Sequence, residues 1–346
     1  MSSFLRVVQP GLRTTVQDLG RVGAQRFGIP VSGALDPVAL RVANILVGNA
    51  EGTAGLEMTA LGPTLQVEAE AARVALAGGR TSLIIERADG TYREVPPMQS
   101  IRLVAGDRLR VGTIAQTAVA YLAVEDGLAL TPFLGSLSTY VRGGFGGLEG
   151  RILAAGDRLP LAAPQVEVRA EMRLDGYEIA PPAAVRVVLG PQDDYFTPET
   201  MARFLGAPYV VTREADRMGL RLEGPPLPHA RDYNIVSDGI APGSIQVPGS
   251  CQPIVLLADR QTTGGYPKIA TVISADLPAF GRLLPGMTIR FQAVTVAEAQ
   301  VARRALETEI AAFTSRLRPV GPDGPDLDRL YDANLVSGVI HAEQLD

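Results

Sequence analysis

The sequence holds few of the side chains on which common catalytic sites are built. It contains one cysteine, Cys251, and only two histidines, His229 and His341. A single cysteine excludes an internal disulfide and is typical of a reducing compartment, so we expect a cytoplasmic protein. Neither histidine lies near Cys251 in the sequence or beside a G-x-S-x-G motif, which argues against a histidine-assisted nucleophile. The same shortage leaves too few ligands for a typical zinc site.

Long apolar runs and clustered positive charge are also lacking. The longest apolar runs, such as 118–124, end far short of the roughly 18 residues that a membrane-spanning helix requires. The first residues, MSSFLRVVQPG, lack the apolar core of a secretory signal. The formal net charge is -5, and no arginine cluster is interleaved with aromatic residues. We therefore expect no membrane and no nucleic-acid partner, which leaves small molecules and other proteins.

Lysine is almost absent from the chain. Lys268 is the only lysine among the 32 lysines and arginines, and it closely follows the Gly264-Gly265 pair. Arginine does not replace lysine where a compact, mobile charge must meet a phosphate or carboxylate. This placement favours a functional lysine. The alternative is that an arginine-rich chain has kept one lysine by chance.

The stretch 237–271 surrounds this lysine and alternates turn formers with short apolar runs. It predicts a strand-turn-strand segment that reverses several times and gathers polar side chains around one cavity. The polar residues of this stretch are Asp238, Gln246, Gln252, Asp259, Gln261, Thr262, Thr263, Tyr266 and Lys268. Gln192, Asp193, Asp216 and Arg217, from elsewhere in the chain, are candidates to join them. Such a set suits binding a small amide or carboxylate and stabilising an oxyanion or phosphoryl group.

Two features of this interpretation have structural alternatives. Asp238 and Asp259 are candidates for contacting Mg²⁺ or acting as a base, but each can instead cap a turn. In the glycine-rich segment 133–150, Ser138 and Arg142 precede the glycines at positions 143, 144, 146 and 147. Its backbone amides can form an anion-binding nest, and the alternative is a flexible surface loop.

The sole lysine is not in a Walker motif, so the sequence contains no nucleotide site of the Walker type.

The pattern of turns and alternation predicts a mainly β protein with two units. Short alternating runs fill 55–161 and a second β-rich unit follows, so we place domains at 1–162 and 185–293 with a linker at 163–184. A helix is predicted after Asp36, which is followed by Pro37 and closed by Gly48. A Thr295-x-x-Glu298 capping box opens a C-terminal helix, placed at 294–318 and followed by a loosely ordered tail at 319–346.

Several motifs together resemble the biotin-dependent carboxyltransferase-like family, which includes the C-type component of 5-oxoprolinase and urea amidolyase-related proteins. They are TTVQDLGRVG, GIPVSGALD, ANILVGN, STYVRGGFGG, GPQDDYF, DRMGLRL, SDGIAPGSIQVPG and LADRQTTGGYPKIATV, and they cover the chain to about residue 295. The resemblance implies tandem cyclophilin-like β-barrels, in agreement with the two β units. Cys251 stands where we expect glycine in the family.

The resemblance further implies a subunit of an ATP-dependent 5-oxoprolinase. Such an enzyme activates 5-oxo-L-proline, by phosphorylation of the lactam, for hydrolysis to L-glutamate, and works with partner proteins of the B and A types. Carried onto this chain, ATP and Mg²⁺ are the implied cofactors. The predicted catalytic residues are Lys268 and Arg217, which would offset the charge of the phosphoryl group, and Asp238 or Asp259, which would hold Mg²⁺. The predicted substrate-binding residues are Gln192, Gln246, Gln252, Gln261, Thr262, Thr263, Gly264, Gly265, Tyr266, Ser138 and Arg142. No residue is firmly assigned as a metal ligand.

Two other functions stay open. One is transfer of a carboxyl group from carboxybiotin to urea or a similar amide. Proteins that carry biotin resemble one another in attaching it to a lysine beside methionine, whereas Lys268 lies between Pro267 and Ile269. No biotin is therefore expected on this chain, and it would have to arrive on another protein. The other function is that of a non-catalytic antagonist of a regulatory partner subunit.

Overall fold

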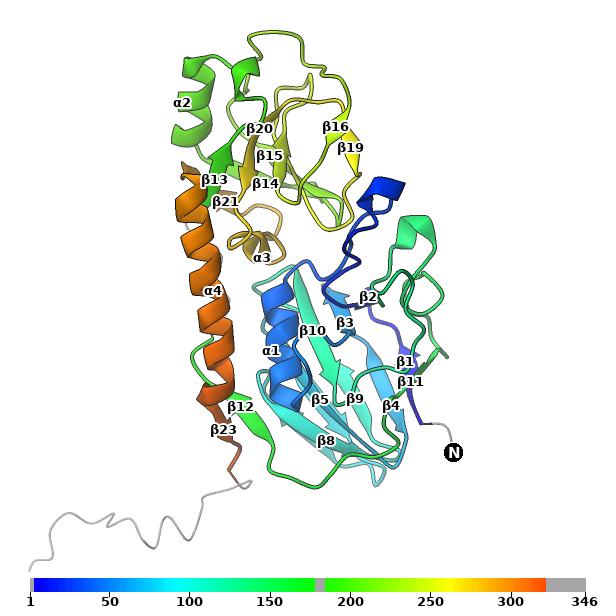
Figure 1. Cartoon of the computed structure of the whole chain (residues 1–346). Helices are drawn as coiled ribbons and strands as arrows, with labels where there is room; N and C mark the ends of the chain where they lie inside the picture. The colour runs from blue at the N-terminus through cyan, green and yellow to red at the C-terminus, as the bar shows by residue number, and fades with distance from the viewer. Residues whose placement is uncertain (1–2, 178–183, 322–346) are drawn as a thin grey trace, which may run out of the picture.

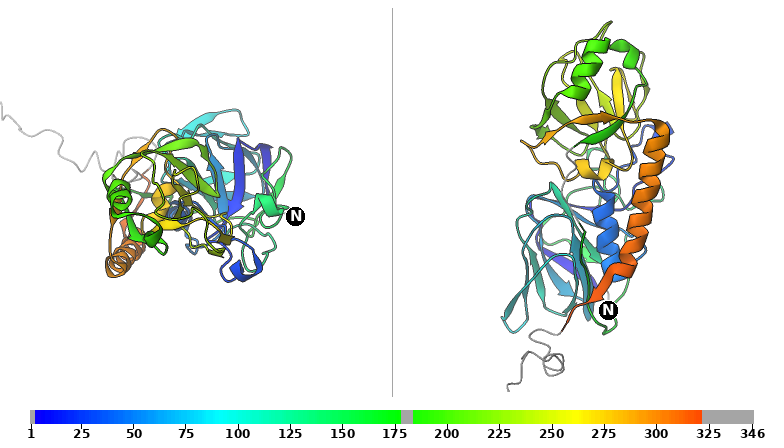
Figure 2. Two further views of the ribbon diagram at one scale, coloured as in Figure 1. Left: turned by 90° about the horizontal axis from the view of Figure 1, so that it is seen from above. Right: turned by 90° about the vertical axis from the view of Figure 1, so that its left-hand side faces the viewer.

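The computed structural model describes residues 3–177 and 184–321. Two β units lie one above the other, and one long helix runs along the side of both (Figure 1). The turned views of Figure 2 show the same stacking from the side. The mainly β class and the tandem β units predicted from the sequence are confirmed. Among the described residues, none of the helices is both long and apolar enough to span a bilayer.

The N-terminal unit consists of two antiparallel sheets around one core. The first has the order β11 (Arg158–Pro160), β1 (Phe4–Gln9), β4 (Thr64–Glu68), β9 (Arg108–Val111), β6 (Leu83–Glu86) and β7 (Tyr92–Val95). The second has the order β2 (Arg13–Gln17), β3 (Gly55–Thr59), β10 (Val119–Val124), β5 (Ala71–Ala77) and β8 (Ser100–Val104). Strand β4 shows why the sheets pack together: its side chains alternate between the two faces of the sheet. Leu65 and Val67 are buried in the core, while the alternating residues Thr64, Gln66 and Glu68 are only half-buried.

Helix α1 (Pro37–Val47) covers the outer face of the second sheet, so strands β5 and β10 are buried on both faces. The helix begins as predicted. The Asp36 side chain accepts hydrogen bonds from the backbone N–H groups of Val38 and Ala39, both at 3.1 Å, and Gly48 ends the helix in the left-handed conformation.

The C-terminal unit is built on an eight-stranded sheet that curves into a nearly closed barrel. Its order is β21 (Thr288–Ile289), β14 (Tyr209–Ala215), β15 (Gly219–Glu223), β18 (Ile254–Leu256), β17 (Ser244–Gln246), β20 (Lys268–Val272), β13 (Val185–Leu189) and β22 (Phe291–Ala293). Only β13 and β22 pair in parallel. A separate two-stranded ladder joins β16 (Asp238–Gly239) to β19 (Thr263–Gly264). Helices α2 (Pro198–Gly206) and α3 (Leu277–Phe280) complete this unit.

Helix α4 (Val296–Arg316) connects the two units. Its predicted capping box is present, because Thr295 and Glu298 exchange hydrogen bonds. Near its end, Ile310 and Phe313 are buried in the core that α1 shares with β5 and β10. The chain then forms β23 (Leu317–Pro319), which pairs with β12 (Met172–Leu174). Strand β12 lies inside the predicted linker 163–184, and β23 includes the last two residues of the predicted helix and the first residue of the predicted tail. Residues 178–183 and 322–346 lie outside the described residues.

Candidate functional site

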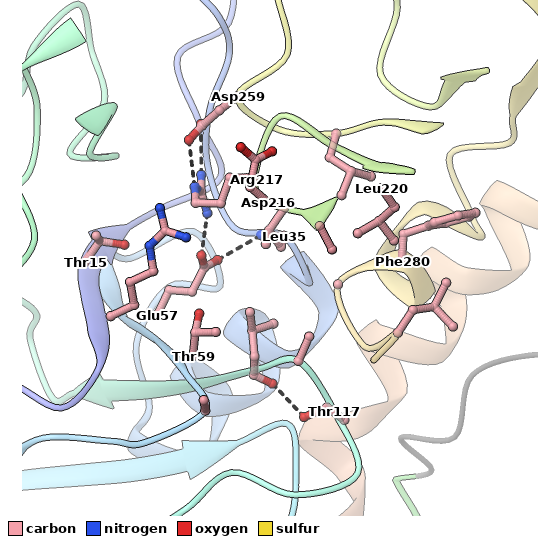
Figure 3. Close-up of a pocket in the computed structure, with 18 of the residues that line it drawn as sticks. Thr15, Leu35, Glu57, Thr59, Thr117, Asp216, Arg217, Leu220, Asp259 and Phe280 are labelled. Atoms are coloured by element: carbon pink, nitrogen blue, oxygen red, sulfur yellow. Dashed lines mark hydrogen bonds and ion pairs between the residues drawn. The ribbon is translucent and has the colours of Figure 1, made fainter. Parts of the chain in front are cut away.

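A cavity of about 390 Å³ lies between the two β units. Strands β2 and β3 of the N-terminal unit contribute Arg13, Thr15, Glu57 and Thr59 to its lining. The C-terminal unit contributes the turn between β14 and β15, which carries Asp216 and Arg217. Leu220, Leu257 and Phe280 form an apolar wall. In Figure 3, Thr15 and Glu57 lie on one side of the pocket, and Leu220 and Phe280 lie on the other.

Arg217 is the central charge of this pocket and links the two units. Its Nε donates to Asp259 Oδ2 at 2.8 Å, and its Nη2 donates to Asp259 Oδ1 at 3.1 Å and to the Gly33 carbonyl at 2.7 Å. Its Nη1 donates to Glu57 Oε1 across the domain boundary. Burial lowers the pKa of Arg217, but the charges of Glu57 and Asp259 more than offset this and raise the pKa above its ordinary value. The guanidinium is therefore permanently charged and held in one orientation.

Glu57 is a site residue that was not predicted from the sequence. It is only 3% exposed, although it lines the pocket. Its Oε2 accepts hydrogen bonds from the Leu35 backbone N–H at 2.9 Å and the Tyr121 hydroxyl at 2.5 Å. Burial, and then the nearby charge of Glu57, raise the pKa of Tyr121 well above its ordinary value, so Tyr121 stays a donor. The available signal was a carboxylate between Leu56 and Met58 in an otherwise apolar strand.

Two further arginines lie at the exposed side of the pocket. Arg142, a predicted site residue, pairs with Asp216 at 3.3 Å, and both side chains are well exposed. Arg13 also lines the pocket and is exposed. Its side chain has no hydrogen bond or ion pair with any residue that the structure describes. Arg13 is therefore available to an anionic group of a ligand.

Lys268 is the centre of a second polar group in the C-terminal unit. The residue is 1% exposed, and its Nζ donates to Asp238 Oδ2 at 2.7 Å and to the Gly239 carbonyl at 3.4 Å. Gln192 accepts from the Lys268 backbone N–H at 3.1 Å and donates to Asp238 Oδ2 at 3.3 Å. The hydrogen bond from Lys268 lowers the pKa of Asp238, with help from the Gly239 N–H. The lysine is thus buried and charge-paired beside predicted partners.

The predicted residues do not all meet in one cavity. Arg142, Arg217 and Asp259 line the pocket between the units, whereas Lys268, Asp238 and Gln192 do not. The segment 259–264 joins the two places, because Gln261 Nε2 donates to Gln246 Oε1 at 3.2 Å, and Gln246 pairs with Lys268 across strands β17 and β20.

The other residues predicted to bind substrate have mixed positions. Thr263 and Gly264 form strand β19, which pairs with the strand that carries Asp238. The backbone carbonyls of Thr262, Gly265 and Tyr266 accept hydrogen bonds from neighbouring segments of the same unit. The Gln252 side chain lies elsewhere and hydrogen-bonds both backbone groups of Gly224. Gln252 therefore stabilises a turn.

Ser138 and the glycine-rich segment also have structural contacts. Ser138 is fully buried, and its hydroxyl donates to Asp18 Oδ1 while accepting from the Asp18 backbone N–H. A Cβ at Gly146 would lie 2.0 Å from the Ser138 carbonyl, so the chain passes too closely there for any other residue. The segment therefore packs tightly around Ser138 and Gly146, whereas residues 141–144 are exposed, and the anion-binding nest and the surface loop both stay predictions.

Cys251 takes a backbone conformation that favours glycine. Its φ is 58°, in the left-handed region, which agrees with the glycine expected from the family. The side chain does not line the pocket between the units.

The acidic residues proposed for Mg²⁺ are engaged within the protein. Both oxygens of Asp259 accept from Arg217, and Asp238 is paired with Lys268. Within residues 3–177 and 184–321, no three His, Cys, Asp or Glu side chains are grouped so as to hold a metal ion. The described residues therefore do not by themselves fit a magnesium site.

A family model described as carboxyltransferase domain, subdomain A and B, matches residues 27–293. The chain belongs to this carboxyltransferase-domain family. Within the family it is 36% identical to the C-type component of the 5-oxoprolinase of Escherichia coli (strain K12) over 302 residues, 87% of this chain and 94% of that protein. It is 38% identical to the corresponding 5-oxoprolinase component of Haemophilus influenzae over 296 residues, 84% of this chain and 92% of that protein.

The fold of this carboxyltransferase-domain protein is also found in a solved structure. The crystal structure of the Kluyveromyces lactis urea carboxylase is similar with a TM-score of 0.80 and 30% identity over 93% of this chain. The match covers only 30% of the urea carboxylase chain. The likeness therefore supports the tandem β architecture and places it within a much longer polypeptide there.

Proposed function

We propose that this protein is the C-type subunit of a cytoplasmic, ATP-dependent 5-oxoprolinase. In this proposal the pocket between the β units binds 5-oxo-L-proline while the lactam is activated by phosphorylation, and partner proteins of the B and A types complete its hydrolysis to L-glutamate. The identity to two 5-oxoprolinase components of the C type, over almost their whole length, supports a subunit role.

The observation that carries the proposal is the composition of the pocket. 5-Oxo-L-proline has a carboxylate, a lactam and an apolar ring edge, and it needs a different contact for each. Arg13 is a cation at the exposed side that has no ion pair with a described residue. Glu57 and Arg217 are polar groups at the buried side, and Leu220 and Phe280 face them. A cavity of about 390 Å³ lies within the range of small-molecule sites, about 300 to 1,000 Å³.

Each side chain has a distinct role in this proposal. Arg13 binds the substrate carboxylate, since a guanidinium forms strong, charge-assisted hydrogen bonds with carboxylates. The Glu57–Arg217 pair contacts the lactam, and the apolar wall excludes water from it. Lys268 lies outside the pocket lining, but segment 259–264 connects its surroundings to Asp259. Its role is therefore to position that segment.

ATP and Mg²⁺ are proposed as cofactors of the assembled enzyme. Asp259 and Asp238 are already paired with Arg217 and Lys268, so these carboxylates do not fit a metal–nucleotide complex on their own. The proposal therefore places the nucleotide where a partner protein contributes to its binding.

Reconstitution tests this proposal. The chain, assembled with its B-type and A-type partners, should release phosphate from ATP only when 5-oxo-L-proline is present. Arg13→Gln should raise the KM for 5-oxo-L-proline about 10-fold to 100-fold, which is the usual loss of affinity when a hydrogen bond to a charged group is removed. Arg110→Gln is the matched control, because Arg110 is an exposed strand arginine outside the pocket. No stimulation by 5-oxo-L-proline would reject the proposed substrate.

A second candidate function is transfer of a carboxyl group from carboxybiotin to urea or a similar amide. The TM-score of 0.80 to the urea carboxylase structure favours it. Lys268 is 1% exposed and paired with Asp238, which supports biotin arriving on another protein rather than on this chain. Carboxylation of urea in the presence of a biotinylated carrier, without any response to 5-oxo-L-proline, would select this function.

A further inference from the structure

At the buried side of the pocket, one N–H group of Arg217 has no acceptor among the described residues. A guanidinium has five N–H groups. Arg217 directs four of them at Asp259 Oδ2, Asp259 Oδ1, the Gly33 carbonyl and Glu57 Oε1. Among the described residues, the second N–H of Nη1 has no acceptor. This leaves one donor on the atom that already contacts Glu57.

Glu57 has a matching unused acceptor. A carboxylate accepts about four hydrogen bonds. Oε2 accepts from the Leu35 N–H and the Tyr121 hydroxyl, and Oε1 accepts, among the described residues, only from Arg217 Nη1. One acceptor position on Oε1 therefore stays open. The open donor and the open acceptor belong to two atoms that are hydrogen-bonded to each other, and both residues line the pocket (Figure 3).

We propose that this Glu57–Arg217 edge recognises amides whose N–H and C=O lie on the same side of the C–N bond. Lactams, primary amides and ureas have this form, and their O and N atoms are about 2.2 Å apart from standard bond lengths and angles. The amide N–H donates to Glu57 Oε1 while Arg217 Nη1 donates to the amide oxygen. A trans secondary amide directs these groups to opposite sides, and a lactone has no N–H.

The edge is held in place before any ligand arrives. Asp259 and the Gly33 carbonyl fix the guanidinium plane, while Leu35 and Tyr121 fix the carboxylate. Glu57 is 3% exposed, so little water competes for its open acceptor. Fixed, charged and shielded groups give hydrogen bonds that discriminate strongly between ligands. The edge therefore acts as a specificity determinant, and the inference rests on the proposed function only in taking 5-oxo-L-proline as one such amide.

Calorimetric titration of the full chain, alone and assembled with its B-type and A-type partners, tests the inference. The ligands are 5-oxo-L-proline, its N-methyl derivative, the lactone with the same ring and carboxylate, 2-pyrrolidinone and urea. The lactam should bind about 10-fold to 100-fold more tightly than the lactone, which differs from it by one charge-assisted hydrogen bond. The N-methyl lactam should also bind weakly. Equal affinity for lactam and lactone would overturn the inference.

Variants separate recognition from folding. Glu57→Gln should reduce the preference for lactam over lactone at least about fivefold, because a neutral oxygen accepts more weakly than a carboxylate. Glu171→Gln is the matched control, because Glu171 also binds a buried arginine, Arg73, and a hydroxyl, but outside the pocket. An unchanged preference in folded Glu57→Gln would contradict the inference. If that variant does not fold, the wild-type series decides.

The ligand series also separates this inference from the proposed function. Binding of 2-pyrrolidinone or urea without binding of 5-oxo-L-proline would reject the proposed substrate and support the amide-reading edge. Binding of 5-oxo-L-proline and its lactone with equal affinity would support the substrate and reject the edge. Failure of every amide to bind the chain, alone or assembled, would overturn the inference.

Discussion

Asp36 is the residue at which one substitution tests what joins the two β units. It is 1% exposed and caps helix α1 of the N-terminal unit. Its Oδ2 also accepts from Arg282 Nε of the C-terminal unit at 2.6 Å, and Arg282 Nη2 donates to the Tyr177 hydroxyl at 2.8 Å. Burial lowers the pKa of Arg282, but the charge of Asp36, its hydrogen bond and the interactions with Tyr177 and Tyr121 together more than offset this and raise the pKa. Removing that charge leaves a buried guanidinium without a counter-ion.

Asp36→Asn should lower the free energy of unfolding by about 3 to 5 kcal/mol, the usual cost of breaking a buried ion pair. Asparagine caps helices as well as aspartate does, so this variant isolates the lost charge. Asp36→Ala removes the cap as well and should cost about 1 kcal/mol more. The difference between the two variants therefore separates the cap from the link between the units.

Urea unfolding followed by circular dichroism gives these free energies, and calorimetry shows whether the two units unfold together. Glu149→Gln, in the exposed pair with Arg151, is the control and should change stability by less than about 1 kcal/mol. An Asp36→Asn variant as stable as the wild type would refute the reasoning. It would mean that water or a neighbouring group replaces the carboxylate.

Three further predictions follow from the site. Lys268→Arg should lose most 5-oxo-L-proline-dependent ATP hydrolysis in the reconstituted enzyme. It should also lower the free energy of unfolding by about 1 to 3 kcal/mol, because the larger side chain overpacks a buried position. Near-normal activity would indicate that the single lysine reflects only the composition of the chain. Tyr121→Phe should cost about 1 to 3 kcal/mol in urea unfolding, because the Asp36 backbone N–H loses its buried acceptor, and no change would indicate that water replaces the hydroxyl. Lys268 lowers the pKa of Asp238 in the folded state, so the stability from this pair should be fully present above the unfolded pKa of about 3.9 and be lost as the pH falls through the lower folded value. The difference in unfolding midpoint between wild type and Asp238→Asn should therefore be constant from about pH 6 to 8 and shrink near pH 3; the opposite trend would contradict it.

Several features were predictable because the interacting residues are close in sequence. Asp36 caps α1 through Val38 and Ala39, and Thr295 and Glu298 form their capping box within four positions. The polar stretch around Lys268 has a similar basis, since Gln246 and Lys268 lie opposite each other on paired strands and the Lys268 ammonium donates to Asp238 of the same stretch. The tandem β architecture followed from motifs shared with a family.

The position of the pocket was not predictable in this way. Arg217 and Asp259 were both expected beside Lys268, but they face the other β unit, because the turn that carries Arg217 meets Glu57, 160 positions away in the chain. Glu57 resembles an ordinary strand residue, and its other partners, Leu35 and Tyr121, are 22 and 64 positions away. No local pattern marks such a residue.

The amino-acid sequence by itself determined the helix caps, the turns, the mainly β class and the neighbourhood of Lys268, since hydrogen bonds and alternation between near neighbours set these features. Only the tertiary structure decided that Arg217, Glu57 and Asp259 share a pocket. The reason is physical: a buried charge is stable only with a counter-ion and hydrogen-bond partners around it, and here the packing of two separate β units supplies them.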